Sequence, residues 1–346
     1  MKKICSQIAM LSILLLSVAS SGAAVLSKSF DVALLPNEPF QKGFQKSITV
    51  DSINQQNVQL TLFNGDTKDG GSRCEDNIIG EGLVSYLNRL DSPTLYSLGD
   101  NEWTDCHRIS NGNYDPLERL SLLRKIFFSK ATTQGVQPMP VKRQGALGEK
   151  FSENSRLIYN EIMFIALHVV GSNNNLVATE KQCKKKSNRA QKDCDAATTE
   201  YIERNRRNIE WLKDSFKIAR DENLAGVALL IQADIYFPFE LSDGGYDDFL
   251  KSLDEKNGFT DFFNTLVDET HNFKGQVVLI HGDSHYFKVD KAMFEKNGTL
   301  TPNFTRVQTF GSNETSWVKM HVNPQSNNVF SFQPVILPNV KELQNK

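Results

Sequence analysis

Three apolar runs in this chain each end near a glycine that precedes an aspartate. Short apolar runs that stop at glycine are typical of buried strands. Open α/β folds bind ligands outside the carboxyl ends of their strands, so three such ends could converge on one site. Carboxylates gathered there would suit a hard divalent cation. The runs cover 60–63, 94–98 and 277–280, and the turns contain Gly65-Asp66, Gly99-Asp100 and Gly282-Asp283.

Strand-like and helix-like patterns alternate through most of the chain. The alternation predicts an α/β protein with helices packed outside sheets, and the antiparallel-looking strands at the end predict a mixed sheet. We find no internal repeat and no interdomain linker, so we expect one domain over 25–346. Predicted strands cover 30–35, 57–63, 94–98, 161–170, 226–232, 277–280, 305–310, 317–322 and 329–332, and predicted helices cover 79–90, 116–128, 197–223, 246–253 and 261–268.

The first 24 residues have the pattern of an export signal. Lys2 and Lys3 precede an apolar run over 8–18, and small residues follow as far as Ala24. This pattern predicts cleavage near Ala24 and a secreted or periplasmic protein without a transmembrane segment. The alternative is a membrane anchor, for which the run is short. The net charge of -2 predicts no nucleic-acid binding, although 184–186 is a small basic cluster.

Four cysteines remain after removal of the signal, an even number that fits an oxidising compartment. Cys74 and Cys106 each follow one of the Gly-Asp turns closely, so we expect them to pair beside the site. Cys183 and Cys194 enclose a charged segment, 181–195, which we expect to be a stapled, solvated loop inserted in the domain. Free thiols are the alternative.

Asp and His recur at or just beyond the ends of the predicted buried strands. Each alone has a structural explanation, because aspartate forms turns and a buried histidine is commonly part of a core. Together they favour a metal centre. Gln232 and Asp234 also follow a strand and could support the ligands. The set is Asp66, Asp100, His168, Asp283 and His285.

The order of these turns resembles the calcineurin-like metallophosphoesterase superfamily. In that superfamily D-x-H, G-D-x-x-D, G-N-H-D/E, a lone His and G-H-x-H follow one another on successive strand ends. Gly65-Asp66-Thr67-Lys68-Asp69 matches the second motif, and Gly99-Asp100-Asn101-Glu102 stands at the third. His168 fits the fourth and Gly282-Asp283-Ser284-His285 the fifth. The likeness covers nearly all of the mature chain and is strongest to a secreted bacterial branch. It implies a four-layer α/β/β/α sandwich of two mixed sheets flanked by helices.

Several positions depart from the family pattern. Asn37 stands where an Asp is expected, Pro39 where a His is expected, and Asn101 where the catalytic His is expected. The resemblance implies two divalent cations. Asp100 stands in place of an Asn ligand and Asp283 in place of a His ligand, and these carboxylate replacements favour Mn²⁺, Mg²⁺ or Ca²⁺ over zinc, with iron left open. The implied ligands are Asp66 as the bridge, Asp100, His168 and Asp283 at one cation, and Asn37 and His285 at the other.

The resemblance also implies a mechanism in which an activated water attacks phosphorus. Asn101 cannot protonate a leaving group, so His281 or His107 could take that role, although both could equally be structural. Arg108 could contact phosphate oxygens or form a surface ion pair.

The sequence therefore favours a secreted metal-dependent phosphoesterase. Its substrate would be a phosphomonoester or phosphodiester, in a phosphorylated small molecule or a lipid headgroup. The alternative is a catalytically impaired protein of the same fold that acts as a binding or effector protein.

Overall fold

The computed structural model describes residues 28–37, 47–241, 244–295, 297–311 and 314–338. The predicted export signal and Pro39 therefore lie outside the described residues. Among the described residues, no helix combines the length and apolarity needed to cross a bilayer.

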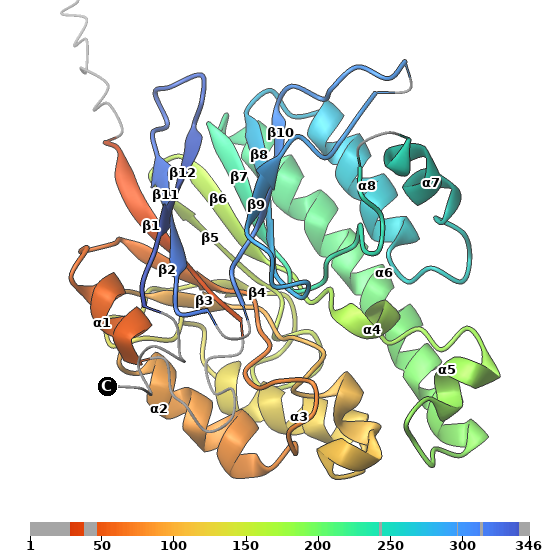
Figure 1. The fold of residues 1–346 in the computed structure, drawn as a ribbon. Helices are drawn as coiled ribbons and strands as arrows, with labels where there is room; N and C mark the ends of the chain where they lie inside the picture. Colours follow the sequence, from red (N-terminus) through yellow and green to blue (C-terminus); the bar gives the residue numbers. More distant parts are fainter. Residues whose placement is uncertain (1–27, 38–46, 242–243, 296, 312–313, 339–346) are drawn as a thin grey trace, which may run out of the picture.

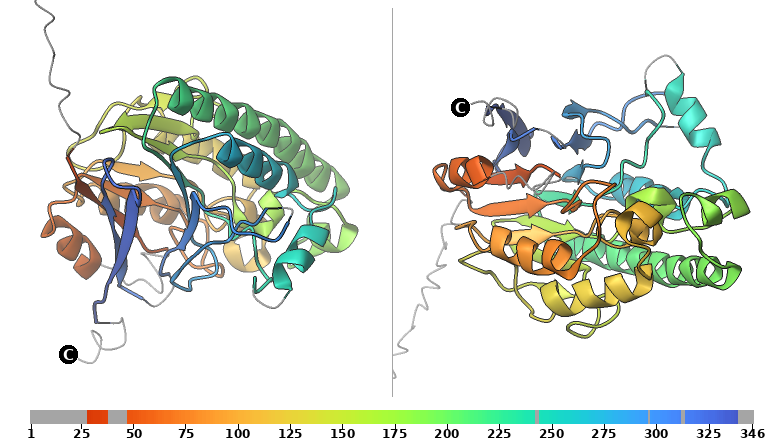
Figure 2. Two further views of the ribbon diagram at one scale, coloured as in Figure 1. Left: turned by 90° about the horizontal axis from the view of Figure 1, so that it is seen from above. Right: turned by 60° about the horizontal axis from the view of Figure 1, so that its bottom comes forward.

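Two mixed sheets pack face to face, with helices over both outer faces (Figures 1 and 2). The predicted arrangement of two mixed sheets flanked by helices is confirmed. The first sheet has the order β12 (Phe330–Val335), β11 (Trp317–Val322), β1 (Phe30–Leu35), β2 (Leu60–Phe63) and β3 (Thr94–Tyr96). The second has the order β4 (Lys142–Arg143), β5 (Ser155–Tyr159), β6 (Ile162–Ala166), β7 (Gly226–Leu230), β8 (Gln276–His281), β10 (Phe304–Gln308) and β9 (Lys288–Asp290).

Alternating side chains of the strands fill three apolar layers. In β1, Val32 and Leu34 lie in the core between the sheets, whereas Ala33 and Leu35 lie in the core beneath the helices. This follows from the two-residue period of a strand, which requires apolar residues on both faces when both faces are covered. The long helix α6 (Gln191–Asp221) covers the second sheet with α8 (Thr260–His271) (Figure 2).

The remaining helices are short. Asp115 caps α3 (Pro116–Phe127) by accepting a hydrogen bond from the Leu117 N–H, as the Asp-Pro pair predicts. The helix predicted over 79–90 divides into a π-helical turn and α2. The others are α1 (Ser47–Asn54), the π-helical turn η2 (Asn77–Gly82), α2 (Leu83–Leu87), the 3₁₀ turns η3 (Thr104–His107) and η4 (Ile109–Asn111), α4 (Gly171–Asn174), α5 (Glu180–Lys184) and α7 (Gly245–Lys251).

Parallel pairing brings the Gly-Asp turns that follow the strands to one edge of each sheet. Strands β1, β2 and β3 are mutually parallel, and so are β6, β7 and β8. The carboxyl ends within each set therefore lie at one edge of its sheet. The disulfides Cys74–Cys106 and Cys183–Cys194 are both present, as predicted, with Cα atoms 5.7 and 5.6 Å apart.

Candidate metal centre

Three aspartates that follow strands of both sheets meet beside the carboxyl ends of those strands. Asp66 follows β2, Asp100 follows β3 and Asp283 follows β8, and each offers a carboxylate oxygen within 4.8 Å of the other two. We call these three side chains the carboxylate cluster. Asp66 and Asp283 have φ values of 54° and 69°, in the left-handed region that aspartate tolerates better than most residues.

Two glycines make this close approach possible. Gly65 has φ +78°, and a Cβ there would lie 2.4 Å from the Gly99 backbone nitrogen. A Cβ on Gly171 would lie 2.8 Å from a carboxylate oxygen of both Asp100 and Asp283. The space between these two carboxylates thus depends on the absence of a side chain at Gly171.

Side-chain amides donate hydrogen bonds into the cluster. Gln232 Nε2 lies 2.9 Å from Asp66 Oδ2 and 3.3 Å from Asp100 Oδ1, and Gln232 Oε1 accepts from the Gly171 N–H at 2.6 Å. Asn37 Nδ2 lies 3.3 Å from Asp66 Oδ2. Gln232 follows β7, the strand between β6 and β8, and therefore reaches the cluster from the second sheet.

A polar wall extends from the cluster on the side of η3. Ser172 Oγ lies 2.8 Å from both Asp100 Oδ2 and Asp105 Oδ1, and Arg108 forms an ion pair with Asp105. The cluster and this wall border a cavity of about 710 Å³. Its other lining residues include Asn101, Asp234, Phe237, Lys185 and His285.

The cavity carries excess negative charge. Burial, together with Asp100 and Asp234, raises the pKa of Asp283 well above its usual value. Burial and the Asp100 charge raise the pKa of Asp105 to about 7. Burial lowers the pKa of Lys68, although acidic neighbours including Glu102 partly oppose this effect.

A divalent cation fits this donor set. Oxygen ligands from three carboxylates that lie this close together are suited to a hard cation. Asp66, Asp100 and Asp283 would hold it, and they lie close enough for one ion. The amide groups of Asn37 and Gln232 carry oxygens that a rotation of the amide would turn toward such an ion.

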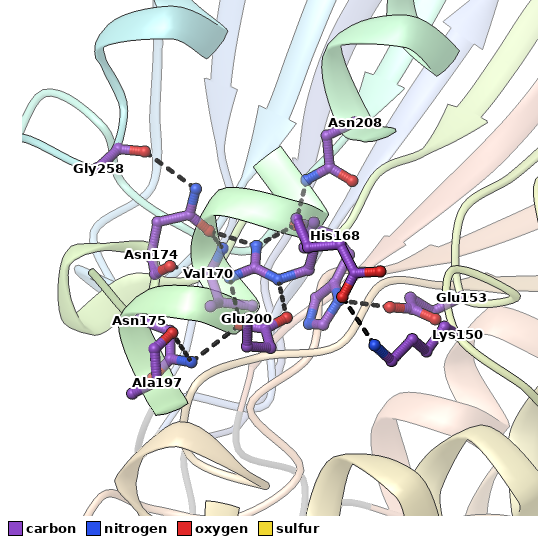
Figure 3. Close-up of polar contacts among 12 residues, drawn as sticks. Lys150, Glu153, His168, Val170, Asn174, Asn175, Ala197, Glu200, Asn208 and Gly258 are labelled. Atoms are coloured by element: carbon purple, nitrogen blue, oxygen red, sulfur yellow. Dashed lines mark hydrogen bonds and ion pairs between the residues drawn. The ribbon is translucent and has the colours of Figure 1, made fainter. Parts of the chain in front are cut away.

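His168 lies outside the cluster, in a buried network (Figure 3). Its Nδ1 lies 2.9 Å from Glu153 Oε1, which also pairs with Arg124, and its ring packs against Trp103. Its carbonyl accepts from Arg204, whose side chain is fully buried. We expected His168 to provide the fourth motif, but the residue that reaches Asp66 and Asp100 is Gln232.

The other candidates divide between the cavity and the protein interior. Asn101 lines the cavity, and its N–H lies 3.4 Å from Asp66 Oδ1. His285 also lines the cavity but is not among the grouped carboxylates, and its ring lies beside Gly311. Burial lowers the pKa of both His281 and His107 to about 4. Neither histidine lines the cavity of the cluster, and His107 instead lines a smaller cavity beside it.

Sequence reasoning missed two important residues. Ser172 lies in α4, where its φ of 49° is left-handed, and a serine after a strand carries no distinctive signal. Glu153 follows a loop rich in Gly and Gln, and only its contact with His168 reveals its role. Gln232 had a signal, since it directly follows a buried strand, but its residue type does not indicate a ligand.

No protein-family model and no curated protein matches the chain. It is similar to solved structures of PhoD, of a dimetal phosphatase from Danio rerio and of a 5'-nucleotidase from Candida albicans, with 10%, 10% and 11% identity. The TM-scores are 0.46, 0.48 and 0.44, over 86%, 84% and 92% of this chain. The matches span 64%, 92% and 53% of those proteins. At these identities the likeness concerns the fold alone.

Proposed function

We propose that the protein is a secreted metal-dependent phosphoesterase that hydrolyses a phosphomonoester or phosphodiester. The observation that carries this proposal is the carboxylate cluster, whose oxygens come from three strand ends and lie within 4.8 Å of one another. Secretion is supported by the export pattern in the sequence and by the two disulfides.

The residues around the cluster have distinct roles in this proposal. Asp66, Asp100 and Asp283 would hold a divalent cation, which would supply charge neutralisation at a phosphoryl oxygen and lower the pKa of an attacking water. Ser172 and the Arg108–Asp105 pair fix the wall on which a phosphoryl group would be oriented. Gln232 holds Asp66 and Asp100 in place from the second sheet. The grouped carboxylates support one cation site, around Asp66, and the proposed ligands of a second cation are Asn37 and His285.

Asn101 limits the substrates that the site can hydrolyse. An amide can orient a leaving group by hydrogen bonding, but it cannot transfer a proton to it. The protein should therefore favour esters with acidic leaving groups, such as p-nitrophenol, over alkyl esters. Asn101→His should reduce the difference in turnover rate between esters with acidic leaving groups and alkyl esters.

A second candidate function is binding without catalysis. It is favoured by one observation: Asn37 and Gln232 already donate hydrogen bonds to Asp66. Hydrogen bonds from two neutral amides could stabilise the charged carboxylate of Asp66 in place of a cation. In that case the protein would bind Mn²⁺ weakly or not at all.

The proposal is tested with p-nitrophenyl phosphate and bis-p-nitrophenyl phosphate, with and without Mn²⁺. We expect Mn²⁺-dependent turnover that Asp66→Ala abolishes. Asp69→Asn is the matched control, because Asp69 lies in the same loop but its carboxylate accepts hydrogen bonds from Gly71 and Ser72. Calorimetric titration with Mn²⁺ separates the candidates: absence of both turnover and Mn²⁺ binding would overturn the phosphoesterase proposal and favour the second candidate.

A further inference from the structure

A second cavity, of about 190 Å³, adjoins the cavity of the carboxylate cluster. The two share Asp105, Arg108, Ser172 and Lys185 in their walls. The smaller cavity differs in charge, because Arg108, Lys185 and Arg189 all line it. We call these three side chains the cationic wall.

Two disulfides hold the segments that form the cationic wall. Cys106 lies two residues before Arg108 and is bonded to Cys74. Cys183 lies two residues before Lys185, and its partner Cys194 follows Arg189 by five residues. The positions of the cations are therefore restrained by covalent bonds on both sides of the cavity.

Hydrogen bonds join these two segments to each other. The Ile109 N–H donates to the Lys186 carbonyl at 3.0 Å, and the His107 ring hydrogen-bonds to the Lys185 backbone. Arg189 donates to the carbonyls of Cys183 and Gln182. The contacts of Arg189 use backbone oxygens, so they orient its side chain without neutralising its charge.

The charges of the wall are only partly compensated. Arg108 pairs with Asp105, whereas neither Lys185 nor Arg189 forms an ion pair within 4.0 Å in the part of the chain that the structure describes. His107 is neutral at pH 7, because burial and the charge of Arg189 lower its pKa to about 4. The cavity therefore has a net positive charge, next to a cluster that needs a cation.

We propose that the cationic wall binds a second anionic group of the substrate, a phosphate or a carboxylate, while the scissile phosphate lies at the carboxylate cluster. The inference rests on the proposed phosphoesterase function and narrows the substrate to a small phosphorylated molecule with two anionic groups. Asp100, Ser172 and Asp105 form a continuous hydrogen-bonded path to Arg108, so the two sites are separated by only a few side chains. Lysine and arginine side chains favour anions by charge-assisted hydrogen bonds.

The first experiment tests the wall without catalysis. The metal-free protein is titrated calorimetrically with inorganic phosphate, which the carboxylate cluster repels. We expect binding that weakens about tenfold or more in Lys185→Ala/Arg189→Ala. Lys181→Ala is the control, because Lys181 is an exposed lysine of the same segment that lines neither cavity. The proposal is overturned if the wild type does not bind phosphate, or if the double variant binds it as tightly as the wild type. Equal loss of binding in the Lys181→Ala control would also overturn it.

The second experiment tests the role of the wall in turnover. Phenyl phosphate and 4-carboxyphenyl phosphate are compared with Mn²⁺ present, because they differ by one carboxylate. Arg189→Ala, at a side chain that lines the smaller cavity but not the cavity of the cluster, should raise the KM of the carboxylated ester about tenfold and change that of phenyl phosphate much less. Equal effects on the two esters would refute a subsite for the second anion. If the wild type hydrolyses neither ester, the proposed catalysis fails and the phosphate titration alone decides whether the wall binds anions.

Discussion

The carboxylate cluster and the network around His168 both begin at strand ends, yet they differ in charge balance. In the network, Glu153 pairs with Arg124 and accepts from His168. In the cluster, the three carboxylates face one another, and burial with the charges of Asp100 and Asp234 raises the pKa of Asp283. A buried network whose charged groups pair with one another is best explained by structure. Three carboxylates that face one another from separate strand ends are best explained by a ligand.

The largest expected effect is on the network. Arg204→Met should lower the free energy of unfolding by about 3–5 kcal/mol, because it removes a buried cation from Glu200 and three backbone or amide oxygens. Urea unfolding measures this change. Arg206→Met on the same helix is the control, since its side chain is 62% exposed, and it should cost less than about 0.5 kcal/mol. Equal effects of the two substitutions would contradict a structural role for the network.

Gly171→Ala should act on the cluster alone. Its Cβ would press against Asp100 and Asp283 and reduce the space for an ion, so Mn²⁺ affinity should fall about 10–100-fold. Calorimetric titration measures the affinity. Gly70→Ala is the control, because Gly70 lines the same cavity but its Cβ would approach Asn101 instead. Unchanged affinity in Gly171→Ala would place the ion elsewhere.

The network should also make the protein sensitive to acid. Burial lowers the pKa of His168 to about 4, and the pKa of Glu153 is also lowered, because Arg124 and His168 outweigh the effect of burial. The stability that neutral His168 contributes is complete above its unfolded pKa of about 6.5 and is lost as the pH falls toward 4. In the presence of a chelator, the stability difference between wild type and His168→Gln should therefore shrink by about 2 kcal/mol from pH 7 to pH 5. A difference that does not change with pH would show that His168 is not neutral in the folded protein.

The smallest expected effect has the opposite sign. Asp283→Asn should raise the free energy of unfolding by about 1 kcal/mol at pH 7 without metal, because it removes one of the repelling carboxylates. Added Mn²⁺ should stabilise the wild type and leave this variant nearly unchanged. Glu153→Gln provides the comparison within the network and should be destabilising. Destabilisation by both substitutions in metal-free buffer would remove the distinction between the two regions.

The sequence by itself determined much of the architecture. Apolar runs such as 30–35 and the helical stripes predicted sheets covered by helices, because burial of apolar side chains follows directly from these patterns. The turns after 60–63, 94–98 and 277–280 predicted that Asp66, Asp100 and Asp283 would meet, and they do. Both disulfide pairings were also predictable, because each pair of cysteines lies beside a turn or encloses a loop.

Only the tertiary structure decided which polar side chains surround the cluster. His168 and Gln232 each follow a buried strand by two residues, so their local patterns are equivalent. The order of the second sheet places β7 beside β8, so that Gln232 reaches Asp66 and His168 contacts Glu153 and Trp103 instead. Hydrophobic periodicity specifies the face of a strand on which a residue lies, but not its neighbours in the sheet. Those neighbours are fixed by long-range pairing and packing. For the same reason the sequence did not predict the cationic wall, whose residues come from two separate disulfide-linked segments.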